Sequence, residues 1–325
     1  MGKITIKELA KITGYSKSTV SYALNGKSGV GDNARKEIIE KAQELGYFPN
    51  PFAQNISSGN YRMIGVMLRD ITNPFYSSVF SVIGKLCEKD GYEVVYYDLA
   101  NDSKRIIKGL EFLRQKMVHG IILDFIGKEK ETVDFINKLN IPVVVFGMNV
   151  SNDISCVQAD DENGARDAVD YGIQCGHQNI YYISKNKKDI YDIRRENSIR
   201  ERCNFHGLDF VNHTIVFKNP KITALEIVKK CPENSLLICY NDVLACKVIS
   251  SLMKINKFVP KDYSIIGFDN IDFIPYPLTT VNIPKSQMAT EAIKLLFKQI
   301  NNNEKEKITL SSKLIIRDSV KQKDE

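Results

Sequence analysis

The stretch TIKELAKITGYSKSTVSYALNG, residues 5–26, decides the fold at the start of the chain. Thr5 and Glu8 fit a capping box, in which a threonine and a glutamate three residues later each satisfy a backbone N–H of the other. Gly14 is a natural left-handed helix stop, and Ser16 is a natural N-cap for a second helix. Two short helices joined by about four residues that include glycine are typical of a helix-turn-helix motif.

The second predicted helix has two different faces. Val20, Ala23 and Leu24 lie on one side and can pack on the first helix. The opposite side carries polar groups: Lys17, Ser18, Ser21, Tyr22 and Asn25. A polar face near a helix N-terminus suits a helix that enters a DNA major groove. On these residues alone, an ordinary solvated face remains the alternative.

Two further helices are predicted downstream. Asp32 can cap the first of them, and Gly46 ends it. Asn50 is a good N-cap for the second and Gly59 a stop, but about two turns are too short for a stable helix in water. Such a segment indicates folding on a partner, with an ordinary interdomain linker as the alternative.

These motifs, in this order, resemble the head of the lactose-repressor/galactose-repressor (LacI/GalR) family. The matching residues are 5–10, 14–21, 24–26, 44–47 and 49–50. The resemblance implies a helix-turn-helix DNA-binding head at 1–48, a hinge helix or linker at 49–60, and an effector-binding and dimerisation body at 61–325.

The resemblance also assigns DNA contacts. Base reading falls to Lys17, Ser18 and Tyr22, and supporting contacts fall to Thr5, Ser16, Thr19, Ser21 and Asn25. The hinge positions are Asn50, Ala53, Gln54 and Ile56, with Ile56 where the family wedges a base step in the minor groove. The family usually places arginine at the position of Tyr22. Tyrosine cannot form the two parallel hydrogen bonds that arginine makes with guanine. We therefore expect an operator that differs from the common family consensus at the bases near Tyr22.

The body alternates apolar strand-like runs with helical patterns. The runs are 63–68, 92–97, 120–123, 142–146, 180–183, 236–239 and 264–268. Continuous apolar runs of this length fit strands buried on both faces, and alternation with helices implies parallel sheets covered by helices. At least seven strands over this length favour an α/β body of two lobes, as in periplasmic binding proteins, with the chain crossing between them.

Polar residues follow several of these strands directly, where open α/β sheets bind ligands. They lie at 70–75, Asp124, 241–242 and 269–270. Each could instead be only a helix N-cap, and Asn73 and Asn241 could do both. The body resembles the family too, which implies an effector cleft lined by Asn73, Phe75, Asp124, Arg195, Asn241, Phe268 and Asp269. The family's R-x-x-G-F lacks its glycine here, so Arg194 or Arg200 could take the place of Arg195.

Carboxylate, amide and guanidinium groups beside an aromatic face suit a polyhydroxylated ring, so a sugar or sugar derivative is the expected effector. Purines and phosphorylated sugars, which the family also binds, are the alternatives. Lys185, Lys187 and Lys188 would favour an anionic effector if they face the cleft, although such a run is more often a solvated loop.

Composition and motifs exclude other classes. The chain of 325 residues carries net charge +6, of which eight Lys and Arg against five Asp and Glu place +3 within residues 1–60. No catalytic constellation, cofactor loop or metal-ligand spacing is present, so we expect no enzyme, cofactor or metal. The seven cysteines are scattered and are expected to be buried thiols. The start lacks a secretory signal and no apolar run would span a membrane, so a cytoplasmic location is expected.

Each head offers few base contacts, which favours a homodimer on double-stranded DNA with a near-palindromic operator. The expected function is therefore transcription regulation, with repression the first choice. A sugar-binding receptor protein without DNA function is the alternative, but it would need a signal peptide and no head.

Overall fold

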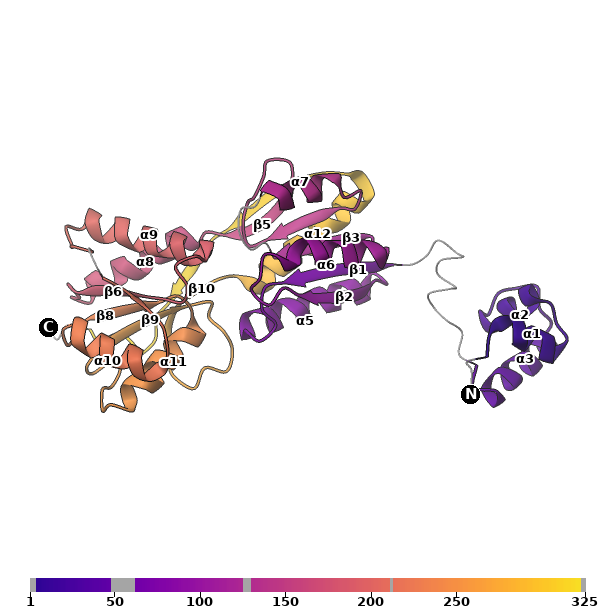
Figure 1. Cartoon of the computed structure of the whole chain (residues 1–325), viewed down its shortest axis with the longest axis horizontal. Coiled ribbons are helices and arrows are strands. Elements are labelled where there is room, and N and C mark those ends of the chain that lie inside the picture. The colour runs from indigo at the N-terminus through magenta and orange to yellow at the C-terminus, as the bar shows by residue number, and fades with distance from the viewer. Residues whose placement is uncertain (1–3, 48–61, 125–129, 211–212, 323–325) are drawn as a thin grey trace. The chain divides into compact units, whose positions relative to one another are not determined.

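The computed structural model describes residues 4–47, 62–124, 130–210 and 213–322 (Figure 1). Contacts between Cα atoms divide the chain into two units, Met1–Tyr61 and Arg62–Glu325. We call the described part of the first unit the head and that of the second unit the body.

The head consists of α1 (Ile6–Thr13), α2 (Lys17–Leu24) and α3 (Asp32–Glu44). Its buried core is formed by one set of apolar side chains from these helices: Leu9, Val20, Ala23, Ile38 and Ala42. The capping box of α1 is confirmed, because Thr5 Oγ1 accepts from the N–H of Glu8 and Glu8 accepts from the N–H of Thr5. The left-handed stop at Gly14 and the Ser16 cap of α2 are confirmed as well.

The predicted cap of α3 is wrong. Gly31, with extended backbone at φ −62° and ψ 150°, occupies the N-cap position, and no side chain bonds the cap. Asp32 is instead the first helical residue. There its negative charge is favoured by the positive end of the helix dipole, which explains why an acidic residue marks this start without capping it.

The first lobe of the body is built on a six-stranded parallel sheet. In spatial order its strands are β11 (Lys307–Leu310), β5 (Ser155–Ala159), β4 (Val143–Phe146), β3 (Gly120–Asp124), β1 (Met63–Leu68) and β2 (Glu93–Asp98). Its helices are α5 (Pro74–Lys89), α6 (Arg105–Gln115), α7 (Lys130–Lys138) and α12 (Lys285–Asn302). Every residue of β1 and β3 is buried, as the continuous apolar runs predicted. The same prediction for 92–97 is wrong, because β2 lies at the edge of the sheet and its residues are exposed or half-buried.

The second lobe also has a six-stranded sheet. In spatial order its strands are β12 (Lys313–Ile315), β10 (Thr279–Asn282), β9 (Ser264–Phe268), β8 (Leu236–Cys239), β6 (Ile180–Ser184) and β7 (Thr214–Val216). Its helices are α8 (Asp161–Gln174), α9 (Ile190–Phe205), α10 (Pro220–Lys230) and α11 (Asp242–Met253). The strand β12 pairs antiparallel with β10, so the sheet is parallel except at this edge.

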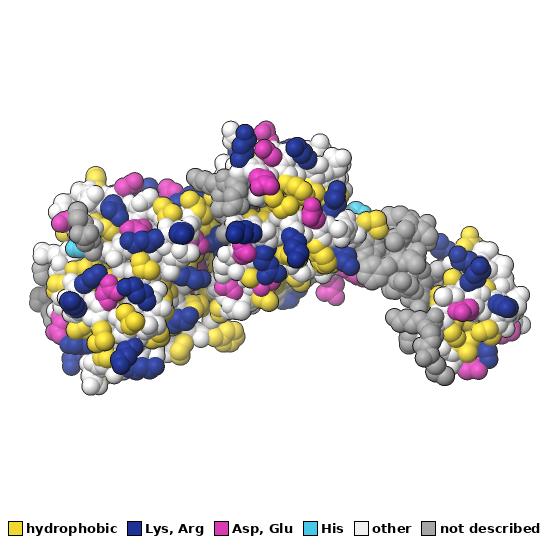
Figure 2. Space-filling model, in the orientation of Figure 1, with side chains coloured by type: hydrophobic (Ala, Val, Ile, Leu, Met, Phe, Trp, Pro, Cys, Tyr) yellow, Lys and Arg dark blue, Asp and Glu magenta, His cyan; other side chains and the backbone are white. Residues whose placement is uncertain are grey.

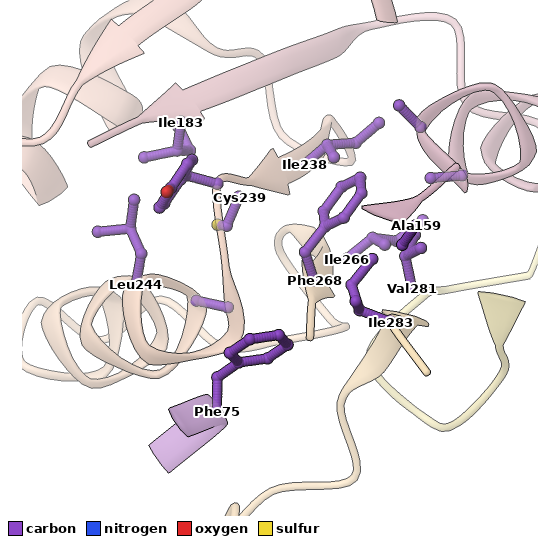
Figure 3. Packing of buried hydrophobic residues seen from close by; sticks show 14 of the residues in the cluster. Phe75, Ala159, Ile183, Ile238, Cys239, Leu244, Ile266, Phe268, Val281 and Ile283 are labelled. Carbon is purple, nitrogen blue, oxygen red and sulfur yellow. The ribbon is translucent and has the colours of Figure 1, made fainter. Parts of the chain in front are cut away.

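The chain passes between the lobes at residues 159–161, 282–285 and 310–313, where strands of one sheet are followed by elements of the other lobe. One cluster of buried apolar residues includes members from both lobes. Figure 3 shows Phe75 and Ala159 of the first lobe with Phe268, Val281 and Ile283. These crossings bring the polar ends of strands from both lobes to one place.

Candidate functional site

The polar face of α2 is open to solvent. Ser16, Lys17, Ser18, Tyr22 and Asn25 are exposed, and Tyr22 keeps 45% of its surface accessible. Thr19 and Ser21 are half-buried. Exposed Lys and Arg side chains of the head are visible in Figure 2. This face therefore presents hydroxyl groups, one amide, one ammonium and one phenol to solvent. The opposite face of α2 packs into the core of the head through Val20 and Ala23.

The C-terminal end of α2 is held by Arg35 of α3. Its guanidinium donates to the carbonyls of Ala23 and Lys27 at 3.1 and 2.6 Å. A cation at this end complements the dipole of α2 and joins the helix end to the turn that follows it. Arg35 thus fixes the direction of α2 without occupying its polar face. The predicted hinge positions Asn50, Ala53, Gln54 and Ile56 lie outside the described residues.

The body contains a cavity of about 620 Å³, including the part open to solvent, where strand ends of the two lobes meet. It is lined by six of the seven predicted effector residues: Asn73, Phe75, Asp124, Arg195, Asn241 and Asp269. Phe268 lies behind this lining, with its ring 4.4 Å from the guanidinium carbon of Arg195. Aromatic rings, carboxylates, amides and guanidinium groups from both lobes therefore line one cavity.

The first-lobe half of the cavity centres on Asp124, the last residue of β3. Its Oδ2 accepts from the Tyr76 hydroxyl at 2.5 Å and lies 3.9 Å from Arg69 Nε. Burial raises the pKa of Asp124, and the Arg69 guanidinium opposes that rise. Asn73 caps α5 by accepting from the N–H of Phe75 at 3.1 Å and also lines the cavity, so both of its predicted roles are compatible with one geometry.

The second-lobe half centres on Arg195 of α9. Its guanidinium donates to Asp161 Oδ2 at 3.0 and 3.3 Å and to the carbonyl of Tyr240 at 2.5 Å, and lies 3.7 Å from Asp269 Oδ1. Burial raises the pKa of Asp269, with Arg195 acting against it. Asn241 both caps α11 at 3.0 Å and lines the cavity.

The three arginines that the sequence left open occupy different places. Arg195 is buried in the cavity with 5% of its surface exposed. Arg194 instead pairs with Glu162 at 2.9 Å, and Arg200 pairs with Glu196 at 2.7 Å with 45% of its side chain exposed. The structure therefore places Arg195, and neither neighbour, at the cavity.

Contacts across the lobes were not foreseen from the sequence. Arg69 Nη1 of the first lobe donates to Asp189 Oδ2 of the second at 2.6 Å, and its guanidinium lies 4.5 Å from the ring centre of Tyr191. Gly147 has φ 99°, and a Cβ there would lie 2.2 Å from the Tyr191 hydroxyl. Glycine thus admits the tyrosine from the opposite lobe.

Arg69, Asp161 and Tyr191 line the cavity but were missed. Arg69 directly follows β1, and Asp161 follows the cap Asp160, so the strand-end rule applied to every charged residue would have found the first two. Tyr191 carries no comparable signal, because its role depends on the close approach of Gly147.

Other site types find little support in the described part of the chain. No group of three or more His, Cys, Asp or Glu side chains there could hold a metal ion. No described helix has the length and apolarity to cross a membrane. All seven cysteines are free thiols, and six are buried as expected, whereas Cys246 is only half-buried.

Comparison with known proteins identifies relatives of both parts. Residues 5–50 match the family model of bacterial regulatory proteins, lacI family, and residues 169–320 match that of a periplasmic binding protein-like domain. The chain is 26% identical over 332 residues to the HTH-type transcriptional repressor PurR of Photobacterium profundum, with 98% of each chain covered.

Solved structures agree. A lac repressor dimer bound to operator and the anti-inducer ONPF superposes with TM-score 0.81 over 98% of this chain and 100% of that one, at 18% identity, which is a likeness of fold. A periplasmic binding protein/LacI transcriptional regulator from Alkaliphilus metalliredigens QYMF, complexed with D-xylulofuranose, has TM-score 0.69 and 26% identity, covering 79% of this chain and 98% of that one.

Proposed function

The chain belongs to the LacI family of bacterial regulatory proteins, and on this premise we propose that it is a repressor of transcription that binds a near-palindromic operator as a homodimer and senses a small uncharged sugar. It is a DNA-binding regulator and not an enzyme. We further propose a cytoplasmic location, because a bacterial operator lies there.

One observation carries the proposal: the chain combines a head whose α2 has an exposed polar face with a body that contains a polar cavity. A sugar-binding receptor has no use for the head. On α2 we assign base reading to Lys17, Ser18 and Tyr22. Minor-groove contact by residues 50–56 remains a prediction from the resemblance.

The charges around the cavity favour an uncharged effector. Arg69 faces Asp124 and Asp189, and Arg195 faces Asp161 and Asp269, so each guanidinium already has carboxylate partners. A phosphate would have to displace one of these carboxylates, which leaves a buried charge without its partner. Lys185 adds a positive charge to the cavity lining, but Asp70 adds a negative one, so the pair does not favour an anionic effector.

Hydroxyl groups suit these paired guanidinium and carboxylate groups better than a phosphate does. A sugar hydroxyl both donates and accepts, so it can bond a carboxylate and a guanidinium of an existing pair at once. The rings of Phe75 and Tyr191 offer apolar faces for C–H groups of a sugar. The relative from Alkaliphilus metalliredigens holds D-xylulofuranose, an uncharged sugar, which supports the same class here.

The DNA-binding role is tested by selecting binding sites for the full-length protein from random duplex DNA. We expect a near-palindrome that differs from the common family consensus at the bases that Tyr22 contacts, because Tyr22 replaces arginine. Affinity for the selected site should fall steeply with salt. Failure to bind duplex DNA of every sequence in dilute salt would refute the role.

The effector class is tested by thermal shift with D-ribose, D-xylulose, D-glucose and D-galactose, the corresponding sugar phosphates, and the nucleobases. We expect at least one free sugar to raise the melting temperature of the body, and its phosphate to raise it less. A larger shift with a phosphate or a nucleobase would overturn the assignment to uncharged sugars.

A further inference from the structure

The loop that carries Asp269 has an unfavourable backbone conformation. Asp269 has φ 100° and Asn270 has φ 46°, although neither is glycine. Side chains with a Cβ are strained in this region, and such residues persist only where the surroundings hold them firmly. Because the side chain of Asp269 lies 3.7 Å from the Arg195 guanidinium in the cavity wall, whatever holds this backbone also sets the effector site.

Lys285 holds the loop from the start of α12. Its Nζ donates to the carbonyl of Asn270 at 2.6 Å and to that of Asp269 at 3.3 Å. Only 8% of the lysine surface is exposed. The two carbonyls are the hydrogen-bond partners of this ammonium. Burial raises the pKa values of the nearby carboxylates of Asp242 and Asp269, and the charge of the ammonium also acts on them by lowering those pKa values.

The position of this lysine is costly. It is the first residue of α12, where the helix dipole is positive and disfavours a second positive charge. Burial removes most of the water that would otherwise solvate the ammonium. Neither helix formation nor a direct ion pair explains a buried lysine here, whereas the two carbonyls of the strained loop do.

Asp242 holds the same loop through a different peptide group. It is fully buried at the start of α11. Its Oδ2 accepts from the N–H of Ile271 at 2.9 Å, and its Oδ1 accepts from the Thr280 hydroxyl at 2.6 Å. A carboxylate and an ammonium therefore bind consecutive residues of one short loop.

We propose that Lys285 is a positioning residue for the effector site, which with Asp242 clamps residues 269–271 so that the Asp269 carboxylate faces Arg195. The clamp also joins the lobes, because α12 packs on α5 and on β3, β4 and β5 of the first lobe whereas the loop follows β9 of the second. A change in lobe orientation that moves α12 thus acts directly on Asp269. The functional meaning of the clamp rests on the proposed effector role of Asp269.

The test compares three substitutions in the full-length protein. Lys285→Met keeps the length of the side chain and removes the ammonium, Lys285→Arg keeps a positive donor, and Lys294→Met is the matched control on the same helix, where the lysine side chain is 61% exposed. Hydrogen–deuterium exchange of the Ile271 amide is measured without any sugar. We expect exchange about tenfold faster in Lys285→Met, and near the wild-type rate in Lys285→Arg and Lys294→Met.

Equal exchange in Lys285→Met and wild type would overturn the proposal. Failure of arginine to restore slow exchange would also overturn it, since a positive donor at this position would then not hold the loop. If Lys285→Met does not fold, Asp242→Ala, which removes the acceptor of the Ile271 N–H, tests the clamp through its other member, and unchanged exchange at Ile271 would again refute it.

A second measurement connects the clamp with function. For each sugar of the thermal-shift panel that the wild type binds, Kd should rise about tenfold in Lys285→Met and recover in Lys285→Arg. An unchanged Kd would show that the loop does not position Asp269. If no panel sugar binds the wild type, the proposed effector class fails, and the exchange measurement still decides the clamp.

Discussion

The head and the cavity use polar side chains in opposite ways. On α2 the polar groups are exposed and several bond only to neighbours on the same surface, while the fold depends on a small apolar core behind them. In the cavity Asp124, Arg195 and Asp269 are 2%, 5% and 6% exposed and are bonded to one another or to neighbours. The first arrangement leaves binding groups free for a partner, whereas the second makes them part of the fold.

This difference predicts that stability and binding can be separated in the head but not in the cavity. The substitutions below test that separation, from the largest expected effect to the smallest. Each is read in the full-length protein, in which the two units are expected to unfold in separate transitions.

Arg195→Ala should have the largest effect. It leaves Asp161 and Asp269 buried without their cation, which costs about 3–5 kcal/mol of body stability. Calorimetry should show a lower melting temperature for the body and an unchanged transition for the head. Arg200→Ala, which removes an exposed arginine five residues along the same helix, is the control and should change little. Equal effects of the two would show that the cavity charges do not support the fold.

Asp242→Asn should alter the pH dependence of body stability. Burial, followed by the charge of Asp269, raises the pKa of Asp242 from 3.8 to about 7 in the folded protein. The folded state therefore binds this proton more tightly than the unfolded chain does. The resulting stabilisation is complete below the unfolded pKa and is lost as the pH rises through about 7.

Wild-type body stability should consequently fall relative to Asp242→Asn between pH 4 and pH 7, by on the order of 3 kcal/mol. Melting temperatures of both proteins across this range provide the measurement. A constant difference between them at all these pH values would mean that Asp242 does not titrate in this interval.

Tyr22→Ala should weaken operator binding without a change in stability. Loss of one base-reading side chain costs about 1–3 kcal/mol of discrimination. Fluorescence anisotropy on the selected operator measures the affinity, and the melting temperature of the head should stay the same because the ring is exposed. Lys36→Ala, at an exposed position of α3, serves as the control. Destabilisation of the head by Tyr22→Ala would contradict the separation.

Thr5→Ala should have the smallest effect, about 1 kcal/mol, through loss of the cap of α1. Only the melting temperature of the head should fall. Lys7→Ala, a substitution at an exposed position of the same helix, is the control and should leave that melting temperature unchanged. A shift of the body transition in Thr5→Ala would show that the two units do not unfold independently.

The sequence by itself determined the features that depend on neighbours in the chain. The caps at Thr5, Ser16, Asn73 and Asn241 could be read because a cap bonds an N–H two or three residues away. The buried strands could be read because their apolar runs are continuous. Polar residues directly after such strands then indicated the place of the cavity.

Only the tertiary structure decided which charges meet. Arg69 and Asp189 are 120 residues apart, Arg195 and Asp161 are 34 apart, and Lys285 reaches a loop 15 residues before it in another lobe. Such pairs have no fixed spacing, because the crossings of the chain between two sheets set their distance. Local hydrogen bonds and the burial of strands can therefore be predicted from the sequence. The partners of buried charges cannot, because they are set by how the two lobes pack together.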